Sequence, residues 1–168
     1  MKENMIIERR IIYALLLIAV TLPLIYPIGW KTEVSGYTQQ AYDLIDSSAE
    51  GDVVIISFDY DPSTMTELQP MGEAMIDHAF KKNLKVIATA LWPMGVQMAD
   101  QAFNKVLEDY PDKVYGRDFV NLGYKVGGMV TIQSMGRSLP EVFPSDQKGQ
   151  KYQEIPMLKG INKLRDVA

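Results

Sequence analysis

Three short apolar runs, separated by two stretches of helical periodicity, constrain the fold of this 168-residue chain more than any other feature. The runs cover residues 53–58, 84–91 and 118–124, and the first two consist largely of apolar and β-branched residues without regular polar alternation. Such runs are typical of strands that are buried on both faces of a sheet. Strands that alternate with helices indicate parallel βαβ units. The sequence therefore predicts an α/β domain with a mainly parallel sheet and a Rossmann- or flavodoxin-like arrangement in three layers.

Two amphipathic helices are expected between these runs. In the first, Thr64 and Glu67 fit a capping box. Because proline is unfavourable inside a helix, we expect one turn from Thr64 and then a main helix with Pro70 in its first turn. The second helix is expected over residues 94–109. A shorter amphipathic helix is expected over residues 37–48, ahead of the first strand.

Beyond Gly127 the pattern is less regular. Residues 129–135 fit either a helix or a strand, residues 139–143 a short helical turn, and residues 145–153 a polar loop. Residues 155–167 carry apolar residues at helical spacing and predict a final helix. Three strands make a small sheet for an α/β layer. We therefore expect the chain to be a piece of a longer protein or a short version of one.

A second constraint is the uncharged run of twenty residues at positions 11–30. As a helix it would span roughly 30 Å, the thickness of the hydrocarbon core of a bilayer. Tyr13, Tyr26 and Trp30 lie near its ends, where aromatic rings favour the membrane interface. The alternatives are a buried core helix, which seldom lacks a polar face, and a cleaved signal peptide, whose apolar region is normally about 7–15 residues. We expect an uncleaved transmembrane anchor, with the lipid bilayer as a partner.

Flanking charge sets the expected orientation of this anchor. Lys2, Arg9 and Arg10 precede the run, and Lys31 follows it. The positive-inside rule then places the N-terminus in the cytoplasm and the domain outside. The expected location is the cell membrane, with a single span and an extracytoplasmic α/β domain. The expected organisation is a cytoplasmic flank at 1–10, the anchor at 11–30, a juxtamembrane helix and linker at 31–50, and the α/β domain at 51–168.

Composition excludes several classes of site. The chain has no cysteine, so it has no disulfide, no thiolate metal site and no cysteine nucleophile. Its one histidine, His78, excludes a metal site built from several histidines and falls within the first amphipathic helix. The net charge is −4, and no basic stripe is present, which argues against nucleic acid as a partner. No motif indicates a cofactor or a metal.

Ligands of parallel α/β sheets bind at the carboxyl ends of the strands. Asp59 and Asp61 follow the first strand and are the candidate catalytic residues. The residues that follow the other two strands are the candidates for ligand binding: Trp92, Tyr124, Lys125, Gly127 and Gly128.

Three kinds of chemistry can be compared with these residues. The Asp59-x-Asp61 pair resembles the nucleophile and acid of haloacid-dehalogenase-type phosphatases, but Ser63 stands where that motif has threonine or valine. The spacing of Gly123 and Gly128 is that of a P-loop, but the lysine and hydroxyl residue that should follow are absent. Asp59, Asp61 and Glu67 could share a divalent cation, whereas the simpler interpretation is that Asp61 begins an Asx-type turn and Glu67 caps a helix.

Three segments carry a resemblance to a known family: ISFDYDPSTMTELQPM, HAFKKNLKVIATALWP and FVNLGYKVGG, all behind one N-terminal apolar run. Together they resemble a family of membrane-anchored bacterial and archaeal proteins of uncharacterised function. The resemblance covers most of the chain, from the apolar run to Lys163. It implies a membrane-anchored α/β protein with further α/β segments and apolar spans in longer members. It implies no activity, cofactor or catalytic residue.

These observations lead to two functional hypotheses. The first is a non-catalytic interaction or assembly subunit of a membrane protein complex, whose partners are other membrane subunits or further copies of itself. The alternative is a hydrolase or ligand-binding enzyme, with Asp59 and Asp61 as acid and base or as Mg²⁺ ligands. In that alternative Trp92 and Tyr124 form substrate walls, and Lys125 contacts an anion.

Overall fold

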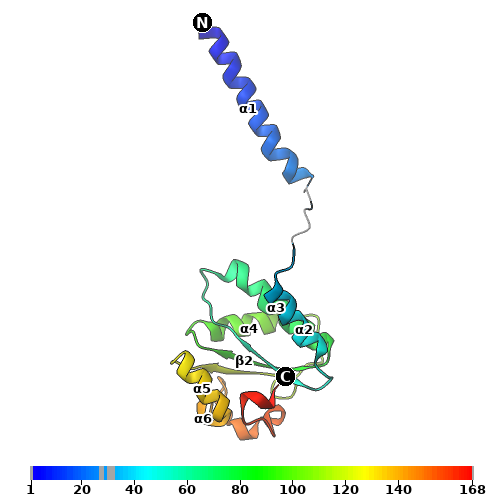
Figure 1. The fold of residues 1–168 in the computed structure, drawn as a ribbon, viewed down its shortest axis with the longest axis vertical. Coiled ribbons are helices and arrows are strands. Elements are labelled where there is room, and N and C mark those ends of the chain that lie inside the picture. The colour runs from blue at the N-terminus through cyan, green and yellow to red at the C-terminus, as the bar shows by residue number, and fades with distance from the viewer. Residues whose placement is uncertain (1, 27–28, 30–32, 168) are drawn as a thin grey trace. The chain divides into compact units, whose positions relative to one another are not determined.

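The computed structural model of the chain describes residues 2–26, 29 and 33–167, with the side chains of residues 2–8 left out of the description. The chain divides into two compact units, Met1–Ser35 and Gly36–Ala168. The first contains one helix, and the second is the α/β domain (Figure 1).

Helix α1, Lys2–Ile25, is the regular element of the first unit. Its large apolar side chains from Ile11 onward are 53–78% exposed. Over the residues that the structure describes, no helix has both the length and the apolar character needed to cross a membrane. The predicted transmembrane helix over residues 11–30 is therefore not supported, and residues 27, 28 and 30 of that prediction lie outside the described residues.

The domain is built on a sheet of three parallel strands in the order β1-β2-β3. These strands are β1 (Val53–Ser57), β2 (Lys85–Ala90) and β3 (Phe119–Tyr124). In their registers Val53 lies opposite Lys85, and Val86 lies opposite Phe119. The predicted α/β class and the parallel sheet are confirmed, and each strand lies within two residues of the predicted bounds.

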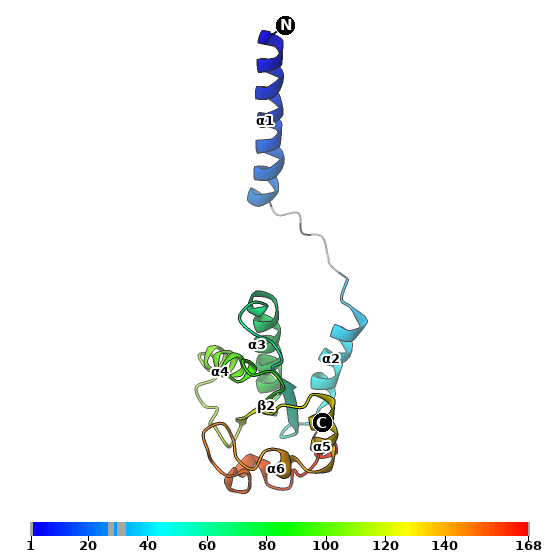
Figure 2. The ribbon, with the colours of Figure 1, turned by 90° about the vertical axis from the view of Figure 1, so that its left-hand side faces the viewer.

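Helices cover both faces of this sheet (Figures 1 and 2). Right-handed crossovers between strands taken in consecutive order place the connecting helices on the same face. That face carries α2 (Gly36–Ser47), α3 (Met65–Lys81) and α4 (Gly95–Val106). The opposite face carries α5 (Met129–Arg137), α6 (Leu139–Val142) and three 3-10 turns, η1 (Tyr152–Glu154), η2 (Pro156–Leu158) and η3 (Leu164–Asp166).

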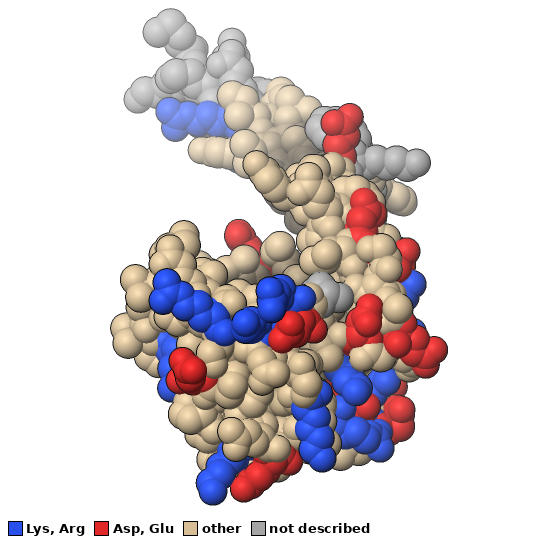
Figure 3. Space-filling view, turned by 60° about the horizontal axis from the view of Figure 1, so that its bottom comes forward, with Lys and Arg blue, Asp and Glu red and all other residues tan. Residues whose placement is uncertain are grey.

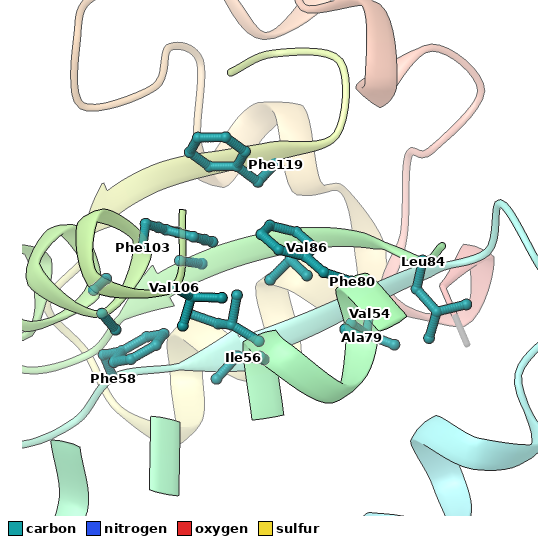
Figure 4. Close-up of a cluster of buried hydrophobic side chains, with 14 of the residues drawn as sticks. Val54, Ile56, Phe58, Ala79, Phe80, Leu84, Val86, Phe103, Val106 and Phe119 are labelled. Atoms are coloured by element: carbon teal, nitrogen blue, oxygen red, sulfur yellow. The ribbon is translucent and has the colours of Figure 1, made fainter. Parts of the chain in front are cut away.

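The larger core lies between the sheet and α3 and α4 (Figure 4). Alternate residues of β1, among them Val54 and Ile56, point into it, as period-two geometry requires. The rings of Phe103 and Phe119 lie 4.7 Å apart within it. Burying one such aromatic side chain stabilises the fold by about 1.5–3 kcal/mol. This core therefore fixes α3 and α4 on the sheet and, through them, the loops at the carboxyl ends of the strands.

The start of α3 differs from the prediction in two ways. Thr64 is the residue before the helix, but its hydroxyl donates to the carbonyl of Asp61 at 3.4 Å and makes no capping bond. The helix is also continuous, with Pro70 in its interior rather than in the first turn of a separate helix. Pro70 deprives the carbonyl of Thr66 of its helical partner, and because both residues are exposed, that carbonyl can be hydrated instead.

The predicted final helix over residues 155–167 is wrong. The segment forms two short 3-10 turns, η2 and η3, and Gly160 between them has φ +89°. A left-handed residue ends a right-handed helix, so the apolar periodicity of this segment reflects docking onto the second core instead. Leu158 and Ile161 are buried there.

Candidate functional site at the carboxyl edge of the sheet

Asp59 joins the ends of two strands. Its Oδ1 accepts a hydrogen bond from the backbone N–H of Leu91 at 2.6 Å, and its Oδ2 accepts from the Ser57 hydroxyl at 2.9 Å. Leu91 directly follows β2, and Ser57 ends β1. The carboxylate therefore satisfies a backbone donor that the end of the parallel ladder leaves without a strand partner, which is a structural role for this candidate catalytic residue.

Asp61 holds the turn that leads into α3. Its Oδ1 accepts from the backbone N–H of Ser63 at 2.8 Å and from the Ser63 hydroxyl at 2.5 Å. These bonds lower the pKa of Asp61, and the Trp92 side chain contributes to the lowering as well. The predicted Asx-type turn is confirmed. Asp61 and Trp92, which the sequence assigned to two different loops, are thus close to each other.

The end of β3 is irregular. Ala88 lies opposite Asn121 and Ala90 opposite Tyr124, so β3 holds one more residue than β2 over this stretch and forms a bulge. Gly123, at the bulge, has φ +86°, a conformation that glycine adopts without strain. The glycine that suggested a P-loop therefore has a conformational role in the strand itself.

Lys125 follows the bulge and lies over the core on the α5 face. Its backbone N–H donates to the carbonyl of Ala90 at 2.9 Å, and its Nζ lies 5.8 Å from the centre of the Phe143 ring. Phe143 is fully buried in the core on the α5 face. The ammonium group is thus placed over that core, and no ion pair within the described residues joins it to Asp59 or Asp61. The structure does not bring Lys125 together with Asp59 and Asp61 as one site.

Gly127 and Gly128 form the tight turn that starts α5. A Cβ on Gly127 would lie 2.5 Å from Oγ1 of Thr131, whose hydroxyl donates to the carbonyl of Val126 at 2.8 Å. Gly128 has φ +50° and immediately precedes the helix. The turn is flanked by exposed apolar side chains, which do not suit a charged phosphate ligand. Close packing against Thr131 explains Gly127, and the positive φ of Gly128, which has open space around it, explains the second glycine.

Exposed apolar side chains follow the carboxyl ends of β2 and β3. We call this set the apolar edge and define it by six residues from the loops after β2 and β3 and from α5: Trp92, Met94, Val126, Met129, Val130 and Ile132. Val126 is 78% exposed, and Met129 and Val130 are each 68% exposed. Exposed apolar groups gathered on one surface are typical of interaction sites. Lysines, arginines and acidic residues are interspersed on the face in Figure 3, without a stripe of one sign.

Two hollows flank the end of β1. The α3 hollow, about 250 Å³, lies between β1 and α3 and is lined by residues that include Phe58, Leu68 and Met71. The α5 hollow, about 190 Å³, lies on the opposite face and is lined by residues that include Ile55 and Ile132. Ser57 and Asp59 border both. The walls of both are largely apolar, so they suit aliphatic groups better than a charged substrate.

One buried polar residue that the sequence pattern did not single out, Asn121, lies on β3. Asn121 is fully buried; its amide group donates to the carbonyl of Val96 at 3.1 Å and to Oδ1 of Asp100 at 3.0 Å, and its Oδ1 accepts from the N–H of Gly123 at 3.0 Å. Gln147 also donates to Asp100, at 2.5 Å. This network ties β3, α4 and the 144–151 loop together. The one signal for it was an asparagine within a buried strand.

A second polar contact ties α3 to its surroundings. The Tyr60 hydroxyl donates to Oε1 of the buried Gln69 at 2.7 Å, and Gln69 donates to the carbonyl of Met98 at 3.3 Å. Burial, with the nearby charge of Glu73, raises the pKa of Tyr60 to about 12. Tyr60 is therefore a neutral donor at physiological pH.

His78 belongs to a third contact, between α2 and α3. Its Nε2 lies 3.4 Å from Oδ1 of Asp46, and its ring stacks on Tyr42 with the centres 4.5 Å apart. It borders a hollow of about 370 Å³ between the two helices, away from the carboxyl edge. Within the described part of the chain no group of three or more histidine, aspartate or glutamate side chains is arranged to hold a metal ion.

Comparison with known proteins found no relative of this chain. No family model, no curated protein and no solved structure matches the chain. The resemblance to membrane-anchored proteins therefore stays a prediction from the sequence, and the function must be argued from the geometry of the domain.

Proposed function

We propose that this protein is a non-catalytic interaction subunit that contributes an α/β domain to a protein assembly at a membrane. The observation that carries the proposal is the apolar edge, where Trp92 is half exposed and Val126, Met129 and Val130 are more so. Shielding such side chains from water contributes about 25 cal/mol per Å². Aromatic and methionine side chains are also enriched at protein interfaces.

The geometry of the aspartates agrees with this proposal. A general base or nucleophile needs a carboxylate oxygen that can reach a substrate. Both oxygens of Asp59 accept hydrogen bonds from the protein, and Oδ1 of Asp61 accepts two from Ser63. The largely apolar hollows beside them offer few polar groups to orient a substrate. We therefore favour the interaction subunit over the hydrolase.

We propose further that the N-terminal segment holds the domain at the membrane. Between Ile11 and Ile25 helix α1 carries no charged residue, and its large apolar side chains are exposed. Water disfavours such a surface, and a bilayer accommodates it. The sequence prediction of a single span over residues 11–30, with the domain outside the cytoplasm, is retained here as part of the proposal.

The interaction can be tested with charge on the apolar edge. The full chain is tagged, expressed in its native cells and extracted with a mild detergent, and the mass of the extracted particle is measured. A double variant, Met129→Lys with Val130→Lys, is compared with Gln133→Lys, which places a charge at an exposed polar position of the same helix. We expect wild type and Gln133→Lys to run as a complex and the double variant as a single chain. A wild-type chain that is monomeric in the extract and turns over a substrate contradicts the proposal.

The membrane attachment needs a separate test. Because the chain has no native cysteine, a single introduced cysteine reports on its own position. We expect the protein to resist alkaline carbonate extraction, and an impermeant maleimide to label Lys159→Cys but not Glu3→Cys in intact cells. Extraction by carbonate would contradict the attachment, and labelling of Glu3→Cys alone would reverse the orientation.

A further inference from the structure

Strand β1 has one hydrogen-bonding side that no strand occupies in the described part of the chain. Towards β2, the N–H of Phe58 donates to Thr89, and the carbonyl of Asp52 accepts from Lys85. Hydrogen-bonding directions alternate along a parallel strand. The N–H and C=O groups of Val53, Ile55 and Ser57 therefore point outward from the sheet.

The surroundings of this edge match a strand rather than a helix or a small molecule. Side chains of an added strand would alternate between the two faces of the sheet. The α3 hollow and the α5 hollow lie on those two faces, and Ser57 and Asp59 border both. The α5 hollow also extends over the end of β2 at Thr89 and Leu91. An engineered cavity of ~150 Å³ accepts a benzene-sized group, so hollows of about 250 and 190 Å³ can each take one large aliphatic side chain.

We propose that β1 is a docking edge at which a partner protein adds one extended segment as a fourth strand. The outward backbone groups would supply affinity, and the two hollows would select large apolar side chains at neighbouring positions, as in other cases of strand addition. The inference rests on the proposed function, because it says how one partner of the interaction subunit binds. It also agrees with the position of Ile132, which belongs to the apolar edge and also lines the α5 hollow.

Charge identifies the occupant further. Asp52 and Asp59 stand at the two ends of β1. Like charges on neighbouring strands destabilise pairing, and opposite charges stabilise it. A second copy of this chain would bring its own Asp52 and Asp59 to the edge. In a two-fold antiparallel pairing centred on Ile55, Asp52 of one copy would lie beside Phe58 of the other, at the α3 hollow. The favoured occupant is therefore an apolar segment with basic flanks from a different protein.

The test uses acetylated peptides and the full chain in detergent. The probe has the sequence RKVLVLVKR, with RKVLILVKR and RKVIVLVKR to vary the apolar positions. EEVLVLVEE reverses the flanking charge, and RKVLPLVKR breaks the extended backbone hydrogen bonding. Amide hydrogen exchange is followed by NMR at single residues. At about ten times the Kd, exchange at Ile55 and Ser57 should slow roughly tenfold, because only the free fraction exchanges.

The pattern of protection identifies the binding mode. Slowing at Ile55 and Ser57 with no change at Val54 and Ile56, which already face β2, is the alternation that strand addition requires. The proline and acidic peptides should bind at least about tenfold more weakly than RKVLVLVKR, a difference equivalent to ~1.4 kcal/mol in binding free energy. Ile55→Pro, which removes an outward N–H together with the Ile55 side chain, should abolish binding, whereas Ile55→Val, which keeps the N–H and an aliphatic side chain, should retain it. If Ile55→Pro does not fold, the exchange pattern of the wild-type chain decides alone.

Two results would overturn the inference. One is that no basic-flanked peptide at 1 mM, a concentration that corresponds to a binding free energy of roughly −4 kcal/mol, slows amide exchange at Ile55 and Ser57. The other is that exchange slows without the alternation along β1. The lysine variant of Met129 and Val130 separates this inference from the proposed function. If the peptides do not bind β1 while the lysine variant still dissociates from the native complex, strand addition is wrong and the interaction subunit stands. If the peptides bind β1 while the variant stays in the complex, the apolar edge is not the assembly surface.

Discussion

Replacing Asp59 tests whether the carboxylate at the end of β1 has a structural role or a chemical one. Its 2.6 Å bond from Leu91 N–H is assisted by charge, and hydrogen bonds to charged groups contribute about 1.5–3 kcal/mol net. Because Asp59 is exposed, the lower end applies, so Asp59→Ala should cost about 1.5 kcal/mol in the free energy of unfolding. For a chain of this size that lowers the melting temperature by roughly 3–6 °C. Asp59→Asn keeps an acceptor for Leu91 and should cost about half as much.

The assay is thermal and urea unfolding of the full chain in detergent, followed by near-UV circular dichroism. Asp112→Ala is the control, because the backbone carbonyl of Asp112, rather than its carboxylate, accepts from Arg117. It should stay within about 0.5 kcal/mol of wild type. The reasoning is refuted if Asp59→Ala and Asp112→Ala melt together, since the bond to Leu91 would then contribute nothing measurable. Loss of a measurable turnover in Asp59→Asn without loss of stability would favour the hydrolase instead.

Three further predictions concern the domain, each measured by the same unfolding assay. Asn121→Ala removes the partners of Val96, Asp100 and Gly123 inside the core and should cost about 3 kcal/mol, whereas a cost below about 1 kcal/mol would show that the network is replaceable. Gly95→Ala places a Cβ against the carbonyl oxygen of Phe58 and should cost about 3 kcal/mol or more, while Gly136→Ala, with open space around it on α5, should stabilise by about 0.5–1 kcal/mol. Equal effects of the two changes on stability would contradict the close packing at Gly95. The pKa of Asp61 is lowered by the hydrogen bonds from Ser63, so the contribution of Asp61 to the free energy of unfolding is complete above the unfolded pKa of about 3.9 and is lost as pH falls through the lower folded value. Asp61→Asn should therefore lose less stability than wild type below pH ~4, and parallel curves of stability against pH for the two proteins would refute this.

The strands could be predicted from sequence because each is a contiguous run whose burial on both faces excludes polar alternation. Predictions from local sequence patterns were wrong where the conformation depends on exposure or packing. Pro70 lies inside α3 because the carbonyl that loses its partner is exposed, and the sequence does not show exposure. The apolar spacing of residues 155–167 could not reveal that Gly160 adopts a left-handed conformation between two short turns.

The location of the candidate site could be predicted from the sequence, but the roles of its residues could not. The carboxyl edge followed from the βαβ pattern alone, and the structure does bring Asp59, Asp61 and Trp92 to it. The partner of Asp59 is a backbone N–H that lies 32 residues away in the chain, and no spacing rule encodes such a contact. Lys125 was assigned to the same site because it follows a strand, but its ammonium group lies over the Phe143 ring, a contact that the sequence did not indicate.

The most direct test of the interaction subunit is the accessibility of Met129 in native membranes. Met129 is 68% exposed in the chain alone, whereas Met98 is 1% exposed and serves as the internal control. Oxidation of both methionines by hydrogen peroxide is measured by mass spectrometry in intact membranes and in the purified chain. The proposal predicts that Met129 oxidises at least several-fold more slowly in the membranes while Met98 stays slow in both. Equal oxidation of Met129 in the two samples would contradict it.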